Sequence, residues 1–205
     1  ALDNSGVVDV LKYSIGFLRG KNENVNGKEI WEWLIDGGIT EDEPNWRCLR
    51  HFHDPLNVSW SGAGLNKASM PLYDSMIYWA QTPEPSDPEN TSDFFNEYSW
   101  AMARKYFHEA LLGGSEEHYA KTFRALGQLM HLVSDAAVPA HVRNDAHLKA
   151  APFGVVIFDD SDPYENWVAN LLSDADQDLE SLAFDDFTVD RAIFDMALQD
   201  AGAPV

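Results

Sequence analysis

Cysteine, basic residues and long apolar runs are all scarce in this sequence. A single cysteine, Cys48, excludes an internal disulfide and a zinc knuckle built on cysteines, so histidine and carboxylate must hold any transition metal. Lys and Arg number 14 against 34 Asp and Glu, which gives a formal net charge of −20 and argues against a basic groove that grips many phosphates. The longest apolar run, 151–158, is far shorter than the ~18 residues that a membrane span requires, so we expect no transmembrane segment.

Helical periodicity dominates what remains. The length of 205 residues suits one domain, and we predict a single domain over 1–205. Large apolar side chains recur three and four residues apart, whereas alternation with a period of two is rare, so the predicted fold class is all-α. The predicted helices cover residues 7–19, 28–36, 68–81, 93–112 and 116–135, with breaks at Gly37-Gly38, the proline-rich stretch 81–90, Gly113-Gly114 and Pro139.

Two local signals refine this pattern. Ser115, followed by two glutamates, predicts the N-cap and acidic first turn of the last long helix. Residues 149–161 interrupt the helical pattern with Pro152, Gly154 and three β-branched residues. We expect them to form a buried loop or a lid over a site. The buried loop is favoured because apolar runs usually lie in the core.

The stretch 131–141 groups residues that can bind metal. His131 and Asp135 lie four apart on a predicted helix, so their side chains leave the same face one turn apart. Gly127, one turn earlier, leaves room for a second element or a substrate, or serves tight helix packing, and both readings stay open. Pro139 is expected to disrupt the helix and turn His141 back toward the pair.

Two further groups of histidine and carboxylate lie elsewhere in the chain. Asp42 precedes the run His51 to Pro55, and Glu165 opens a predicted helix after Pro163. Three such groups without zinc-binding cysteines favour a hard or borderline divalent metal bound through nitrogen and oxygen. The alternative is a set of buried, hydrogen-bonded polar residues.

Taken in order, the runs HFHDP (51–55), HLVSDAAVPAH (131–141) and PYENWV (163–168) resemble the zinc-dependent phospholipase C and single-strand-specific nuclease superfamily. Members of that superfamily are compact helical bundles with three zinc ions in a cleft. The resemblance spans positions 42 to 168. It implies an exported protein, periplasmic or secreted, that hydrolyses a phosphodiester with zinc.

The resemblance also implies a set of zinc ligands. One zinc would be surrounded by Asp42, His51, His131 and Asp135, and Asp135 would bridge to a neighbouring ion. Asp42 would in addition act in catalysis, by orienting the nucleophile or taking its proton.

A second zinc is implied near the other end of the motif set. Its ligands would be His141, Glu165 and a second histidine four residues before that acid, where this chain has Ser161. The groups that can fill this position are Asp162, His147 or water. The family holds its third zinc with the amino terminus of a leading tryptophan and a nearby histidine, whereas this chain begins with Ala1. We therefore expect that an N-terminal segment with further ligands is missing, with two or three Zn²⁺ in the complete protein and one or two in this chain.

The implied chemistry is hydrolysis by a metal-activated water, whose pKa falls from 15.7 toward ~7 when it is shared between two ions. The expected substrate is a phospholipid or another phosphodiester. Residues 152–158, Trp46 and Trp60 are candidates for contact with an apolar group. The alternatives are a nuclease acting on single-stranded nucleic acid, for which the same aromatic residues would stack on bases, and an inactive, metal-stabilised domain that binds a phosphorylated ligand.

Overall fold

The computed structural model describes residues 5–57, 63–65, 73–85 and 95–143, and the backbone of two short strands at 148–150 and 156–158. Its chain divides into two compact units, 1–146 and 147–205, each of which is described by itself. All helices of the described part of the chain lie in the first unit. The prediction of a helical protein is confirmed at this level, because the described residues are mostly helical.

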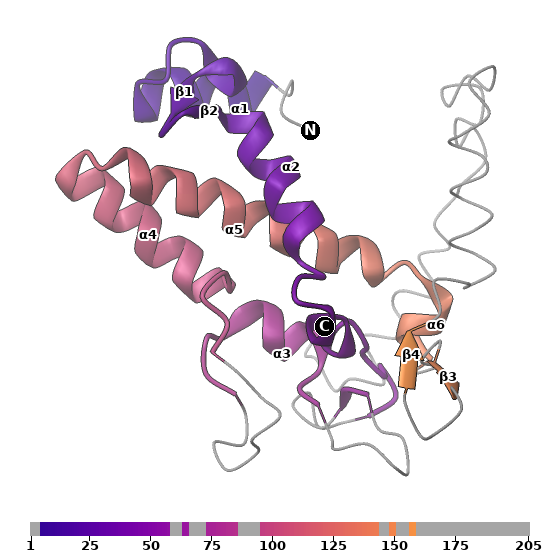
Figure 1. Cartoon of the computed structure of the whole chain (residues 1–205). Coiled ribbons are helices and arrows are strands. Elements are labelled where there is room, and N and C mark those ends of the chain that lie inside the picture. The colour runs from indigo at the N-terminus through magenta and orange to yellow at the C-terminus, as the bar shows by residue number, and fades with distance from the viewer. Residues whose placement is uncertain are drawn as a thin grey trace, which may run out of the picture. The chain divides into compact units, whose positions relative to one another are not determined.

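The first unit is built mainly from four α-helices that follow an N-terminal helical segment (Figure 1). The larger helices are α2 (Ile30–Thr40), α3 (Met76–Gln81), α4 (Trp100–Gly113) and α5 (Glu116–Asp135). The shorter elements are α1 (Ser5–Asp9), η1 (Val10–Ile15), η2 (Gly20–Asn22), β1 (Asn24–Val25), β2 (Lys28–Glu29), η3 (Asn45–Arg50) and α6 (Pro139–Val142), with β1 and β2 paired antiparallel.

Local capping explains where these helices begin. Ser115 Oγ accepts a hydrogen bond from His118 N at 3.4 Å, and two glutamates occupy the first turn of α5, as predicted. Gly114 ends α4 with a positive φ that suits glycine. Ser75 and Ser99 cap α3 and α4 in the same way, so both helices begin later than the apolar periodicity predicted.

The prediction for Gly37-Gly38 was wrong, because α2 runs through both residues. A side chain at Gly37 would meet the carbonyl oxygen of Arg124 at 2.1 Å, and one at Gly127 would meet the carbonyl oxygen of Leu34 at 2.1 Å. Glycine is therefore required on both helices for α2 to cross α5 this closely (Figure 1). Of the two readings of Gly127, tight helix packing is the one observed.

Apolar side chains along α5 pack against the N-terminal segment, α2 and α3. Phe123 packs with Leu11, Ile30 and Leu34, and Leu132 packs with Met76 and Trp79. Between η1, α3, α4 and α5 lies an apolar cavity of about 1200 Å³. Because α5 turns its apolar side to these contacts, His131 and Asp135 are left on the side that faces the end of α2 and the segment after η3.

In the second unit the structure describes a hairpin. Strands β3 (Leu148–Ala150) and β4 (Val156–Phe158) pair antiparallel, with Leu148 opposite Phe158. The sequence predicted only a loop or a lid over 149–161, and residues 151–155 and 159–161 lie outside the described part. None of the helices described here combines the length and the apolar character needed to cross a bilayer.

Candidate metal centre

Five of the six predicted ligands come together from separate segments of the first unit. Asp42 follows α2, His51 directly follows η3, His131 and Asp135 lie on α5, and His141 lies in α6. The sixth, Glu165, lies outside the described residues, as do the possible substitutes for the missing histidine: Ser161, Asp162 and His147.

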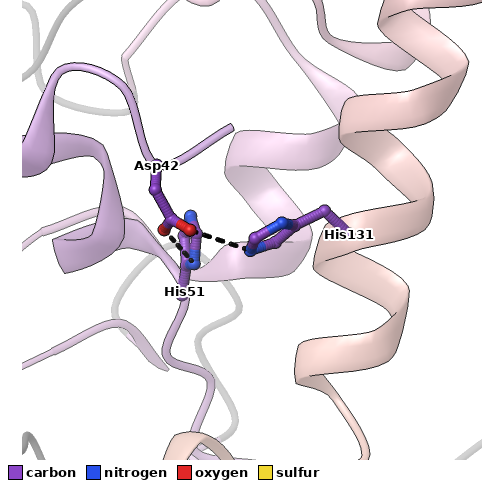
Figure 2. Close-up of side chains that lie close together, drawn as sticks. All are labelled: Asp42, His51 and His131. Carbon is purple, nitrogen blue, oxygen red and sulfur yellow. Dashed lines mark ion pairs between the residues drawn. The ribbon is translucent and has the colours of Figure 1, made fainter. Parts of the chain in front are cut away.

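Three of these side chains form a group that can hold a metal ion. Asp42, His51 and His131 each offer a ligand atom, and these atoms all lie within 4.8 Å of one another. Figure 2 shows the carboxylate of Asp42 paired with both imidazole rings, 3.5 Å from Nδ1 of His51 and 3.7 Å from Nε2 of His131. The Asp42 side chain is 51% exposed, whereas that of His51 is only 3% exposed, so the group opens to solvent on the Asp42 side.

Asp135 joins this group to a third histidine. Its Oδ2 lies 2.8 Å from His51 Nδ1 and 3.4 Å from His131 Nε2, while its Oδ1 lies 3.6 Å from His141 Nδ1. The two carboxylate oxygens therefore face different histidines. A carboxylate placed in this way can bind on two sides.

The separations between these ligand atoms can accommodate a metal ion. Ligand atoms on a tetrahedral zinc lie about 2.0 Å from the ion, and therefore roughly 3.3 Å from one another, which is close to the separations found here. Asp135 Oδ2 is buried, yet it makes no hydrogen bond within the described residues although His51 and His131 are both near. A cation shared with the histidines would give this oxygen a further partner.

The packing of α2 on α5 fixes the orientation of His131. Its Nδ1 lies 2.7 Å from the carbonyl oxygen of Gly38, which can only accept a hydrogen bond. The proton of the neutral ring is therefore on Nδ1, and the lone pair of Nε2 is free to face Asp42 and Asp135. The close approach at Gly37 and Gly127 is what brings this carbonyl within reach.

The turn at Pro139 places His141 as predicted. Val138 has an extended backbone, and Pro139 begins the short helix α6 that carries the histidine. His53 N donates to the carbonyl oxygen of His141 at 3.0 Å, which ties the HFHDP run to this turn. The partners predicted for His141, namely Glu165 and a group at or near position 161, lie outside the described residues.

Buried charges stabilise the protonated form of His51. Burial alone lowers its pKa, but the close carboxylates of Asp135 and Glu41 outweigh burial and raise the pKa to about 9. For the carboxyl of Glu41, burial instead raises the pKa. Its contacts with His51 and Arg47 outweigh burial, so the pKa of Glu41 lies below its usual range. Without a metal, His51 is therefore a cation among carboxylates, and a divalent ion can take the place of its proton.

A groove beside His131 was not predicted from the sequence. This groove has a volume of about 1020 Å³, and its lining includes Lys21, Trp31, Ile35 and Met130. The last three are 38%, 52% and 56% exposed, so the groove presents apolar surface to solvent. Trp31 and Ile35 lie four residues apart on α2, on a stripe separate from the buried one, and this spacing could have revealed that side of the groove. Of the predicted apolar contacts, Trp46 packs against a core cluster and does not line this groove. Trp60 and residues 152–155 lie outside the described residues, and only the backbone of 156–158 is described.

Comparison of this chain with family models, with curated proteins and with solved structures finds no match.

Proposed function

We propose that this chain is a zinc-dependent phosphodiester hydrolase of the phospholipase C type, exported and built on the helical fold of that superfamily. The observation that carries the proposal is the convergence of Asp42, His51 and His131 on one point, with Asp135 against both histidines. These residues come from three segments of the chain and are the ones that the motif resemblance implied. A chance cluster of surface acids would not assemble two inward-facing imidazoles.

The donor set favours zinc. Two imidazole nitrogens and two carboxylates suit a borderline divalent ion, and zinc takes four such ligands readily. A second ion is supported by the other oxygen of Asp135, which faces His141 at 3.6 Å. His141 and Asp135 would be the described ligands of that ion.

The chemistry that zinc supplies when bound is polarisation of a phosphoryl oxygen and of water. The chain's own contribution is to place acceptors around that water. Asp42 is half exposed and lies on the open side, so its carboxylate can orient an incoming water or accept its proton. Asp135, by contrast, is enclosed and serves as a fixed anion.

The groove next to His131 supports a substrate that carries an apolar part. Trp31 donates its indole N–H to Glu29 Oε2 at 2.6 Å, which leaves the ring faces for contact. With Ile35 and Met130 exposed beside it, an apolar group attached to the phosphate would lose water on binding. This favours a phospholipid or a similarly apolar phosphodiester over a small polar one.

Elemental analysis of the whole chain, purified without added metal and without a histidine tag, tests the proposal. We expect about one or two zinc ions per chain. Hydrolysis of phosphatidylcholine vesicles, bis(4-nitrophenyl) phosphate and single-stranded DNA is then measured before and after chelation, and chelation should abolish it until zinc is restored.

The outcomes separate the alternatives. Hydrolysis of DNA but not of the lipid would make the chain a single-strand nuclease, and bound zinc without any hydrolysis would make it a binding protein. A folded chain that binds no zinc, or one that keeps full activity after the metal is removed, would overturn the proposal.

A further inference from the structure

Glu41 is a fully buried carboxylate next to the exposed ligand Asp42. It caps the C-terminal end of α2, and its side chain has no solvent exposure, whereas that of Asp42 is 51% exposed. Burying one carboxylate costs on the order of several kcal/mol unless partners compensate for the lost water. A carboxylate kept at this depth beside a metal centre therefore needs an explanation.

Three hydrogen bonds account for most of the capacity of Glu41. Arg47 donates from Nε to Oε2 at 2.9 Å and from Nη2 to Oε1 at 3.0 Å, and Trp79 donates from Nε1 to Oε1 at 3.0 Å. Arg47 is itself held by Gln128 on α5, at 2.8 Å. The carboxylate is thus clamped between η3, α3 and α5 and has little freedom to turn.

The remaining neighbour of Glu41 is the metal ligand His51. Glu41 Oε2 lies 3.5 Å from Nε2 of His51, and this buried nitrogen makes no hydrogen bond within the described residues. The other ring nitrogen, Nδ1, faces Asp42 and Asp135. The ring is therefore placed with one nitrogen toward the metal centre and the other toward a fixed anion.

We propose that Glu41 is a positioning residue for the metal centre: it accepts the Nε2 proton of His51 and so directs the lone pair of Nδ1 toward the ion. The inference rests on the proposed metal site, and it assigns a role to a residue that the motifs do not include. A long contact in the absence of the ion is expected to shorten when the ion draws Nδ1.

The two histidines of the centre are then oriented by different acceptors. His131 donates from Nδ1 to the neutral carbonyl of Gly38, whereas His51 faces a charged carboxylate. A carboxylate accepts a stronger hydrogen bond and adds a negative charge near the dication. His51 should therefore be the more firmly held ligand of the pair.

The variant Glu41→Gln tests this role with little change of shape. The amide oxygen can still accept from Arg47, but the charge is lost and one acceptor is replaced by a donor. We expect Zn²⁺ affinity, measured by competition with a chromogenic chelator, to fall by about 10- to 100-fold. Asp36→Asn is the matched control, because it removes a carboxylate from the same helix that faces Lys28 and Arg124 instead of the centre.

A second measurement does not depend on a variant. Two-bond ¹H–¹⁵N NMR of the wild-type chain loaded with Zn²⁺ reports which nitrogen of His51 carries the proton. We expect the proton on Nε2 and the metal on Nδ1. Visible absorption of the Co²⁺-loaded chain should also change between wild type and Glu41→Gln, but not in Asp36→Asn.

Failure of this inference differs from failure of the proposed function. The role of Glu41 would be overturned if Glu41→Gln bound zinc as tightly as wild type, or if wild type bound zinc through Nε2 of His51. Either result would leave the metal site standing. Wild type that binds no zinc at all would overturn both.

Discussion

The two carboxylates at the centre differ in exposure, although both lie near the same histidines. Asp42 is half exposed, while the side chain of Asp135 is 10% exposed and contacts three histidines. Removal of a ligand from the enclosed side should therefore cost more than removal from the open side, where water can replace it. Under the proposed function, we therefore expect His51, His131 and Asp135 to retain the metal and Asp42 to act on the nucleophile.

Loss of His131 tests this assignment. His131→Ala removes an imidazole that is already oriented by Gly38, so zinc affinity should fall by more than the roughly 10- to 100-fold typical of residues behind the ligands. Equilibrium dialysis followed by elemental analysis measures the loss. His108→Ala, at an exposed position of α4, is the control and should bind zinc like wild type. Equal losses in the two variants would contradict the assignment.

The pKa of His51 predicts how the stability of the metal-free chain changes with pH. Its folded pKa of about 9 lies above the usual 6.5, so the proton binds the folded state more tightly. The resulting stability is fully present below pH ~6.5 and is lost as pH rises through about 9, on the order of 3 kcal/mol in total. Urea unfolding with chelator present, at several pH values, measures this change.

His51→Gln provides the reference for that titration. Its free energy of unfolding should vary less between pH 6 and 9.5 than that of wild type, because the titrating group is gone. A wild-type chain whose stability rises over this range, relative to the variant, would show that the carboxylates do not hold the proton.

At the scale of elements, the crossing of α2 and α5 decides whether the centre forms. Gly37→Ala would place a methyl group 2.1 Å from the carbonyl oxygen of Arg124, so the helices must separate. We expect a loss of about 2 to 4 kcal/mol in the free energy of unfolding, together with weaker zinc binding as Gly38 moves away from His131. Chemical denaturation and zinc competition measure the two effects.

The neighbouring glycine is the matched control. A methyl group at Gly38 would lie 3.7 Å from the carbonyl oxygen of Gly127, which is an ordinary contact. Gly38→Ala should therefore be neutral or stabilising by up to about 1 kcal/mol, since alanine favours a helix. Similar destabilisation by both substitutions would argue against the close crossing.

The elements that sequence analysis predicted well are those set by local signals. Helix α5 has a serine cap, an acidic first turn and an apolar stripe, and all three lie within its own sequence. Gly37-Gly38 was misread because the same dipeptide can end a helix or admit a neighbour, and only α5 decides between the two. The pairing of β3 with β4 depends on backbone hydrogen bonds between segments that show no alternation of their own.

The same distinction holds for the site. His131, Asp135 and His141 follow from helix spacing and a proline, which are local. Glu41 could not be found in this way, because it lies beside Asp42 and Glu43 in what looks like a solvated acidic turn. Its burial depends on Arg47, Trp79 and Gln128, which come from three other segments.

For the whole molecule, the centre draws its ligands from four segments of the first unit. Its residues follow α2 and η3 and lie on α5 and α6, so an ion bound there would join the beginning of the unit to its end. An excess of acidic residues gives the chain a net charge of −20, and this repulsion is relieved locally by each divalent ion. Metal binding should therefore act on the stability of the entire helical unit.

Chelation measures that coupling. An ion that binds only the folded chain stabilises it by about 4 kcal/mol when its free concentration is a thousand times its dissociation constant, which corresponds to roughly 10 °C in Tm for a chain of this size. Calorimetry of wild type with zinc and with chelator should show a shift of this order, whereas His131→Ala should unfold at nearly the same temperature in both. The variant keeps every acidic residue of the chain. An equal shift in the two proteins would therefore mean that zinc acts through the acidic surface instead of through the centre.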